Sequence, residues 1–350
     1  MSFNRLDPQD FVVSADAVSS TIFTGNQTTL TEFYTSSAQE TGQSGEYYLN
    51  VLNTASGLAD SEIQFAIAYA DSTGGGASAY NPAVNNYSPT TTLYGSYRTL
   101  VLEDENASFN FGNVTSSYFY ALSIERARYK ESLFPGSLNL QISSSAGSTD
   151  ALVLTDNSQD VNVPQYFGTM RAYQVISGSN GTAYNKTSGT FGNNVGYTEA
   201  SGSYGLFLPD IGTILLNGLA LDQNNVQGVN LGTLRTNTDA NNPQKLFVHL
   251  SGSATAGGSS FKLACQETIT SDYVFIRARS SEMNYSENPS FISGSTGEVI
   301  YPYFINNPTV YPTTVGMYND ENDLLAVAKL SKPIQKDFTK EALVRVKLDF

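Results

Sequence analysis

The chain has 350 residues, and its 18 Lys and Arg against 32 Asp and Glu give a formal net charge of -14 and an isoelectric point near 4.4. A protein this acidic is repelled by nucleic acids and anionic bilayers, which are therefore excluded as its main ligands. A single Cys, Cys265, excludes an intramolecular disulfide, and a single His, His249, excludes a metal site built from several imidazoles of one chain. The 40% of apolar residues is enough for a folded core.

The surface is expected to be mostly neutral. Only 14% of the residues are charged, whereas Ser, Thr and Asn make up roughly 30%. The chain has no run of 18 apolar residues, so we expect no membrane insertion. Its start, MSFNRLDPQDF, lacks the charged-then-apolar pattern of a signal peptide. We therefore expect synthesis in a cytosolic compartment, with release by lysis if the protein leaves the cell.

Short runs with an aromatic or β-branched residue at about every second position predict strands along most of the chain. The earlier runs are GEYYLNVLNT (45–54), SEIQFAIAYA (61–70), TTTLYGSYRTLVLE (90–103), SSYFYALSIERARY (116–129), GSLNLQIS (136–143) and DALVLT (150–155). The later runs are KLFVHLSG (245–252), SFKLACQETI (260–269), DYVFIRAR (272–279), TTVGMYN (313–319), LLAVAKLS (324–331) and EALVRVKLDF (341–350). Residues 212–223 fit a short helix or a strand equally well.

These patterns predict an all-β fold with two or three antiparallel β-sandwich-like domains and an extended N-terminal arm. The Ser/Thr-rich residues 1–43 would form the arm, with one pairing segment at most. Residues 44–160 and 245–350 would form sandwich domains, and 161–244 a connecting region with a long Gly/Asn-rich loop at 177–203. We find no repeat of fixed length, which argues against a propeller or a β-helix.

Cys265 and His249 are the only candidates for a thiol nucleophile with an imidazole base. Cys265 lies among apolar neighbours in FKLACQE, and His249 lies in a predicted strand. We therefore interpret Cys265 as a buried structural thiol and His249 as a structural residue.

Two acidic segments, LEDENASF (102–109) and YNDENDLL (318–325), could supply the carboxylate pair of a polysaccharide-cleaving enzyme. Both also resemble hairpin turns, which favour Asn and Asp. The loops DNSQD (156–160) and NDEND (319–323) carry oxygen ligands for Ca²⁺ without the full spacing of a calcium loop. Residues 72–78, STGGGAS, lack the context of a phosphate-binding loop, and a hairpin tip is the better interpretation.

Positive charge is concentrated at the end of the chain. Arg5 is the only basic residue before Arg98, whereas six cations occupy the last 22 positions. The acidic N-terminal part and the basic C-terminal part could dock between neighbouring subunits. Alternatively, the Lys residues that alternate with apolar ones in LLAVAKLSKPIQKDF (324–338) merely protect an edge strand.

The most specific signal is a resemblance in the C-terminal part. Its elements are NPSF (288–291), the predicted hairpin TTVGMYNDENDLLAVAKLSKP (313–333) and RVKLDF (345–350), and a further element is SIERARYKESLFPGSLNLQI (123–142). In the hairpin, the turn 319–323 would let VGMY pair with LLAVAKL, and Pro333 would follow the end of the second strand. Residues 284–350 and 123–142 resemble virion structural proteins of contractile-tailed bacteriophages, especially of the marine cyanophage type. They cover about a quarter of the chain.

The resemblance implies a structural subunit with no enzymatic activity and no cofactor. It implies other virion proteins, and copies of the same chain, as partners, a position in the tail or baseplate, and location in the virion. A neck or capsid position stays open. The assembly interface would include cations and the terminal aromatic residue, namely Arg126, Arg128, Lys130, Lys329, Lys332, Lys336, Lys340, Arg345, Lys347 and Phe350.

An alternative from another class is a receptor- or glycan-binding adhesin of the virion. The Tyr-containing segments 78–88 and 177–203 would then present amphipathic side chains to a host sugar. A polysaccharide-cleaving enzyme that uses Asp and Glu is the third possibility.

Overall fold

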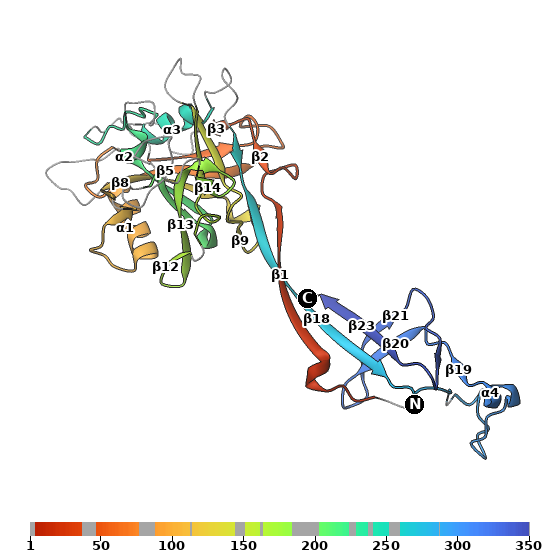
Figure 1. The fold of residues 1–350 in the computed structure, drawn as a ribbon. Coiled ribbons are helices and arrows are strands. Elements are labelled where there is room, and N and C mark those ends of the chain that lie inside the picture. The colour runs from red at the N-terminus through yellow and green to blue at the C-terminus, as the bar shows by residue number, and fades with distance from the viewer. Residues whose placement is uncertain are drawn as a thin grey trace. The chain divides into compact units, whose positions relative to one another are not determined.

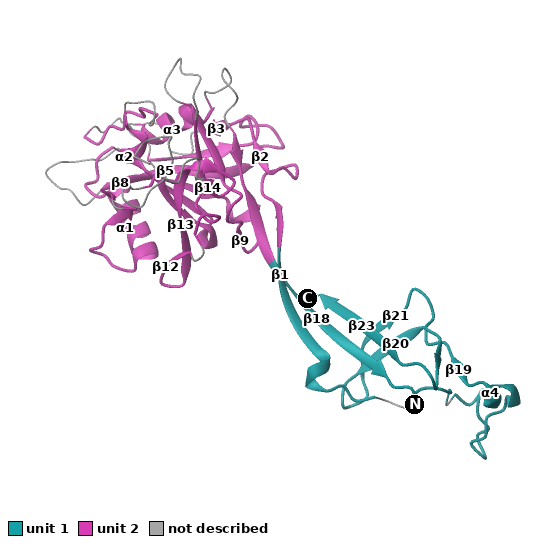
Figure 2. Cartoon of the chain, in the orientation of Figure 1, with its two compact units in different colours: residues 1–17, 268–350 teal, residues 18–267 magenta. Residues whose placement is uncertain are grey.

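The computed structural model describes residues 4–36, 47–76, 88–112, 114–143, 151–161, 164–183, 203–223, 229–236, 241–251, 260–286 and 288–349. This part of the chain is 44% strand and 15% helix, and its sheets are antiparallel. The mainly antiparallel β fold predicted from the sequence is confirmed. The chain divides into a larger unit, Val18–Glu267, and a smaller unit formed by Met1–Ala17 and Thr268–Phe350 (Figure 2).

One strongly curled sheet is the framework of the larger unit (Figure 1). Its strand order is β2-β17-β10-β11-β13-β15-β16-β8-β5-β4-β3, and β12 and β14 pair with β13 outside this path. The strands are β2 (Thr29–Leu30), β3 (Tyr34–Ser36), β4 (Tyr48–Leu52), β5 (Ile63–Asp71), β8 (Tyr118–Ile124), β10 (Asn139–Ser143), β11 (Ala151–Asp156), β12 (Gln165–Phe167), β13 (Met170–Ser179), β14 (Thr182–Ala183), β15 (Gly205–Leu208), β16 (Thr213–Asn217) and β17 (Phe261–Lys262). A separate pair consists of β6 (Phe109–Phe111) and β7 (Val114–Ser116), and β9 (Ser132–Leu133) pairs with β18 (Ala264–Ala278).

Both faces of the central strands are packed. This sheet therefore differs from the predicted sandwiches, in which two sheets pack face to face. Tyr120 and Leu122 of β8 belong to one hydrophobic cluster, together with residues of helices α2 (Gly218–Leu221) and α3 (Asn242–Ser251). Phe119 and Ala121 of the same strand belong to a second cluster, together with residues of helix α1 (Pro89–Leu102). Successive side chains of a strand point to opposite faces, so helices and loops cover the sheet on both sides.

The segment 90–103, predicted as a strand, is instead helix α1 (Pro89–Leu102). Ser88 caps its N-terminus by accepting a hydrogen bond from the backbone N–H of Thr91, and Pro89 occupies the first turn. The buried residues Thr90, Tyr94 and Val101 have helical spacing. The strand prediction was wrong because aromatic and β-branched residues fit both a strand and a helix. The local signal for a helix is the pair Ser88-Pro89, which is typical of a helix N-terminus.

The segment 245–252 was also predicted as a strand, and its described residues, 245–251, lie in helix α3 (Asn242–Ser251). Pro243, Leu246, Phe247 and Leu250 are buried at intervals of three and four residues, which is one helical face. Residues 212–223 contain both predicted alternatives, first β16 and then the short helix α2 (Gly218–Leu221). The remaining helices are the 3₁₀ turns η1 (Pro8–Asp10), η2 (Arg126–Arg128) and η4 (Pro209–Ile211), and α4 (Pro302–Asn306).

The smaller unit is built on a sheet in which β18 lies between β1 and β23. These strands are β1 (Phe11–Thr21), β18 (Ala264–Ala278) and β23 (Ala342–Asp349), and two further pairs are β19 (Thr309–Val310) with β22 (Lys336–Asp337) and β20 (Thr314–Tyr318) with β21 (Leu324–Lys329). The two strands predicted at 260–269 and 272–279 are largely the single strand β18, preceded by β17. The predicted pairing of VGMY with LLAVAKL is confirmed by the register of β20 and β21.

The two units do not follow the four segments expected from composition. Strand β11 pairs with β13, so the expected boundary at 160 falls inside one sheet. Strand β17 pairs with β10 and β2, so residues after 245 contribute to the larger unit as far as Glu267. The predicted arm contains β1, which pairs with β18, as well as β2 and β3. Such long-range pairings leave no local mark in the sequence.

Two glycines with opposite surroundings test this fold. A Cβ at Gly95 in α1 would meet nothing within 4 Å, so Gly95→Ala should stabilise the protein by about 0.5–1 kcal/mol through a better helix propensity. A Cβ at Gly205 in β15 would lie 2.0 Å from the backbone oxygen of Leu215, so Gly205→Ala should be destabilising. Urea unfolding measures both changes, and equal destabilisation by the two substitutions would contradict α1.

Candidate functional site

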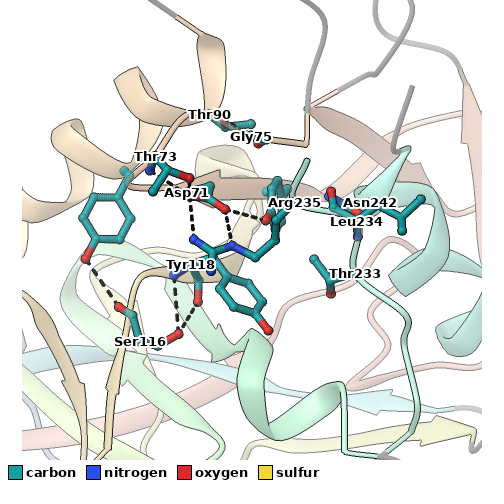
Figure 3. A network of polar contacts seen from close by, with 12 residues as sticks. Asp71, Thr73, Gly75, Thr90, Ser116, Tyr118, Thr233, Leu234, Arg235 and Asn242 are labelled. Carbon is teal, nitrogen blue, oxygen red and sulfur yellow. Dashed lines mark hydrogen bonds and ion pairs between the residues drawn. The ribbon is translucent and has the colours of Figure 1, made fainter. Parts of the chain in front are cut away.

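The larger unit contains a buried polar network around Asp71 (Figure 3). The Asp71 carboxylate receives hydrogen bonds from Nε and Nη2 of Arg235 at 2.7 and 3.1 Å. Tyr69 donates its hydroxyl at 3.0 Å, and Thr73 donates both its backbone N–H and its hydroxyl. The guanidinium also lies 4.6 Å from the centre of the Tyr118 ring. A buried carboxylate with this many donors is fully satisfied.

A second carboxylate, Asp222, extends the network. It accepts hydrogen bonds from the Tyr118 hydroxyl at 2.8 Å and from the backbone N–H and hydroxyl of Thr233 at 3.0 and 2.8 Å. Because the Thr233 hydroxyl donates to Asp222, the Tyr120 hydroxyl donates to Thr233 at 2.8 Å. These contacts hold the segment 229–236 against β5 and β8.

Asn242, at the start of α3, completes the attachment of that segment. Its side chain accepts a hydrogen bond from the backbone N–H of Leu234 and donates one to the carbonyl of the same residue, both at 3.0 Å. Burial raises the pKa of Tyr69 and of Tyr118, and the nearby carboxylates raise both further. The phenols therefore stay neutral donors. The arrangement positions backbone, and its satisfied groups are poorly suited to acid–base chemistry.

Cys265 and His249 make separate contacts. Cys265 is buried, as predicted, and its Sγ lies 3.1 Å from the Ser20 hydroxyl. His249 lies on α3 and not on the predicted strand, and its Nδ1 donates to the backbone carbonyl of Ser143 at 2.8 Å. Both residues have structural partners, in line with the structural roles assigned to them from the sequence.

The acidic segments lie in turns. Asn319 accepts hydrogen bonds from the backbone N–H groups of Glu321 and Asp323, which closes the turn between β20 and β21. In 102–109, Glu103 ends α1 with φ 55°, and Asp104 accepts a hydrogen bond from the backbone N–H of Asn106. The first is the predicted hairpin turn, and the second is a helix-to-strand turn. Within the described ranges, no group of three or more His, Cys, Asp or Glu side chains is placed to hold a metal ion.

The predicted interface cations fall in both units. Lys329 and Lys332 are exposed, Lys340 pairs with Asp337, and Arg345 and Lys347 lie on the exposed side of β23, all in the smaller unit. Lys336 differs from them because it is buried. Its ammonium donates to Asn284 Oδ1 at 2.8 Å and to the carbonyls of Ser280 and Asp337, so it is not available to a cationic surface.

Arg126, Arg128 and Lys130 lie in the larger unit, where each has a partner in the chain. Arg126 donates to the carbonyl of Tyr129 and lies over its ring. Arg128 pairs with Glu62 at 3.0 Å, and Lys130 pairs with Glu267. Phe350 and most of the loops 78–88 and 177–203 lie outside the described residues.

The feature that distinguishes the smaller unit is how little apolar surface it buries. Among its described residues, the buried hydrophobic side chains are Val274, Ala342 and Val346, and the other members of the buried core lie in the larger unit. Its exposed large apolar residues are Phe11, Val12, Val13, Met283, Tyr285, Ile300, Tyr301, Tyr303, Ile305, Tyr311, Tyr318, Leu324, Leu325, Val327, Phe338 and Leu343. We call this set the exposed apolar surface.

The hairpin of β20 and β21 contributes several of these residues. It forms a sheet of two strands, and Leu324, Leu325 and Val327 are all more than half exposed. Tyr318 and Leu324 lie over Gly316, since a Cβ there would meet Tyr318 at 3.0 Å and Leu324 at 3.3 Å. A two-stranded hairpin is marginally stable in water unless another surface covers an apolar face.

Aromatic residues around α4 form another part of the exposed apolar surface. Phe291 packs against Tyr301 and Phe304 with ring centres 5.8 and 4.8 Å apart, and Tyr301 packs against Tyr303 at 5.7 Å. Helix α4 has no buried residue, and Tyr303 is 73% exposed. An exposed aromatic group of this kind is typical of an interaction surface.

The sequence did not predict this surface, because the interface predicted from it consists of cations and the terminal aromatic residue. The run Phe11-Val12-Val13 is a strand signal inside the expected arm, and it now belongs to β1. The Tyr and Ile residues of 300–305 are a second local concentration of apolar side chains that belong to this surface. Alternation alone does not show whether an apolar side chain is covered, so the exposure became visible only in the structure.

Comparisons with known proteins add no relative. No family model matches the chain, and neither a curated protein nor a solved structure matches it. No helix of the described part is long and apolar enough to cross a membrane. The fold and the site must therefore be interpreted from their own geometry.

The buried network supplies a stability test. Arg235→Met leaves the Asp71 carboxylate buried without its cation, so we expect a loss of about 2–3 kcal/mol of unfolding free energy. Lys130→Met breaks an exposed ion pair in the same unit and should cost less than about 1 kcal/mol. Urea titration monitored by circular dichroism compares them, and similar losses would contradict a structural role for the network.

Proposed function

We propose that the chain is a structural virion protein of a contractile-tailed bacteriophage, in the tail or baseplate, that acts through multi-subunit protein contacts. The observation that carries this proposal is the exposed apolar surface of a unit with almost no buried core of its own. Such a surface is costly in water and becomes stabilising when neighbouring subunits cover it.

Two further features support the proposal. The segment 284–350, which resembles virion proteins, lies entirely in the smaller unit. The small charged fraction reduces the desolvation cost when large surfaces are buried between proteins. A neck or capsid position satisfies the same contacts and stays open.

In this proposal the protein is not an enzyme and uses no cofactor. The turn 319–323 and the network around Asp71 have the structural roles described above. The expected partners are other virion proteins and copies of the chain, the location is the virion, and the protein is made in the host cytoplasm and released by lysis. The finer expectation of sandwich-like units with an N-terminal arm at residues 1–43 belongs to this proposal. The structure describes residues 4–36 of that arm, where β1 pairs with β18 of the same chain.

Purified particles of the phage that encodes the chain test the proposal directly. We expect mass spectrometry to find the chain as a stoichiometric component, and a cryo-EM map to show residues 284–349 covered by neighbouring subunits. The presence of the chain in the lysate but not in particles would overturn the proposal.

A substitution in the hairpin tests the apolar contact itself. Leu325→Asp replaces an apolar side chain that is 68% exposed in the single chain, so the isolated protein should fold normally. Its incorporation into particles should fall about tenfold or more, since burying a leucine contributes roughly 1.5–3 kcal/mol and burying a charge is unfavourable. The matched control is Leu58→Asp, in a loop of the larger unit, which should assemble like the wild type.

A second candidate, a glycan-binding adhesin of the virion, is favoured by the exposed Tyr301, Tyr303 and Tyr311. Tyrosine rings can stack on the apolar faces of sugars and offer a hydroxyl for hydrogen bonding. A glycan array with the purified chain, and with Tyr303→Ala, separates this role from assembly. Binding that the substitution abolishes would support the adhesin, and no binding to any host glycan would reject it.

A further inference from the structure

The sheet of the smaller unit has two outer edges. Strand β18 lies in the middle, with β1 on one side and β23 on the other, and no other described strand pairs with the outer edge of either. Within this unit, β1 contributes Phe11–Ala17 and β23 contributes Ala342–Asp349, so the two edges have similar lengths. Each edge offers backbone N–H and C=O groups to a further strand.

The edge at β1 has little of the usual protection. Edge strands commonly carry Lys, Pro or a bulge that discourages pairing, and the sequence FVVSADAVSST has neither Lys nor Pro. Phe11, Val12 and Val13 are exposed by 48, 49 and 68% although they are consecutive. Because successive side chains point to opposite faces, both faces of this strand are uncovered.

The two edges carry opposite charge. The only charged side chain of β1 is Asp16, whereas Arg345 and Lys347 lie on the exposed side of β23. Lys347 pairs with Asp349 of the same strand at 2.8 Å, whereas Arg345 lies over the Tyr273 ring at 5.3 Å, so Arg345 is the main cation that β23 offers to a partner.

We propose that β1 of one copy pairs with β23 of a second copy, so that their sheets become continuous. This rests on the proposed assembly function and names the partner as the same chain. Pairing two β1 edges would bring together two acidic edges, and pairing two β23 edges would bring together two edges of net positive charge. Like charges across a strand pair are unfavourable, so the head-to-tail pairing is the one that charge selects. Such a contact forms a ring when its rotation closes, or a filament when it does not.

Charge reversal of the full-length chain tests the pairing. We expect the wild type to self-associate in sedimentation velocity runs over a concentration series. Asp16→Lys and Arg345→Glu should each weaken association about tenfold, and Val13→Lys should do the same through the apolar edge. The controls are Glu321→Lys and Lys262→Glu, which make equal charge changes at exposed positions outside the two edges.

Mixing the two edge variants provides the decisive result. The native β1 of the Arg345→Glu copy meets the native β23 of the Asp16→Lys copy, so a 1:1 mixture should associate more tightly than either variant alone. Circular dichroism and thermal melting confirm that each variant is folded. A monomeric wild type at every concentration, or a mixture that associates no more tightly than either variant alone, would overturn the pairing. Incorporation of the chain into particles is a separate measurement, so the assembly function can stand when this pairing fails.

Discussion

Apolar burial is the constraint on which the rest of the structure depends, and it is divided very unequally between the two units. The larger unit packs both faces of a curled sheet, with aromatic contacts such as Phe65 on Phe261 at 5.2 Å. The smaller unit buries few apolar side chains and exposes many. Since apolar burial is the main force that offsets chain entropy, the larger unit obtains much more of this stabilisation from its own described residues than the smaller unit does.

The buried polar groups follow the same division. In the larger unit, Asp71 and Asp222 are surrounded by donors, and Asn242 acts on Leu234 as a neighbouring strand would. A loop that crosses an apolar core needs such partners for its backbone. In the smaller unit the corresponding buried group is Lys336, which fastens Ser280 and Asn284. The hydrogen bonds of Lys336 therefore hold the backbone of the smaller unit where few apolar contacts do so.

The sequence predicted those elements whose local pattern allowed one interpretation. The turn 319–323 fixed the hairpin, because its Asn and Asp residues suit a chain reversal and the flanking strands alternate. Helices α1 and α3 were missed because Tyr, Thr and Val fit a strand as well as a helical face. The exposed apolar surface could not be predicted, since exposure depends on contacts between residues far apart in the chain. Lys336 shows the same limit, as nothing in its neighbourhood marks it as buried.

The distribution of charge now has a structural meaning. In the full sequence the larger unit carries most of the net negative charge, and the terminal cations belong to the smaller one. Cations on β23 discourage two such edges from pairing with each other. The same cations are complementary to an acidic edge, and β1 is acidic. The same strand can therefore avoid pairing with a second β23 and favour pairing with β1, because its cations repel a positively charged edge and attract an acidic one.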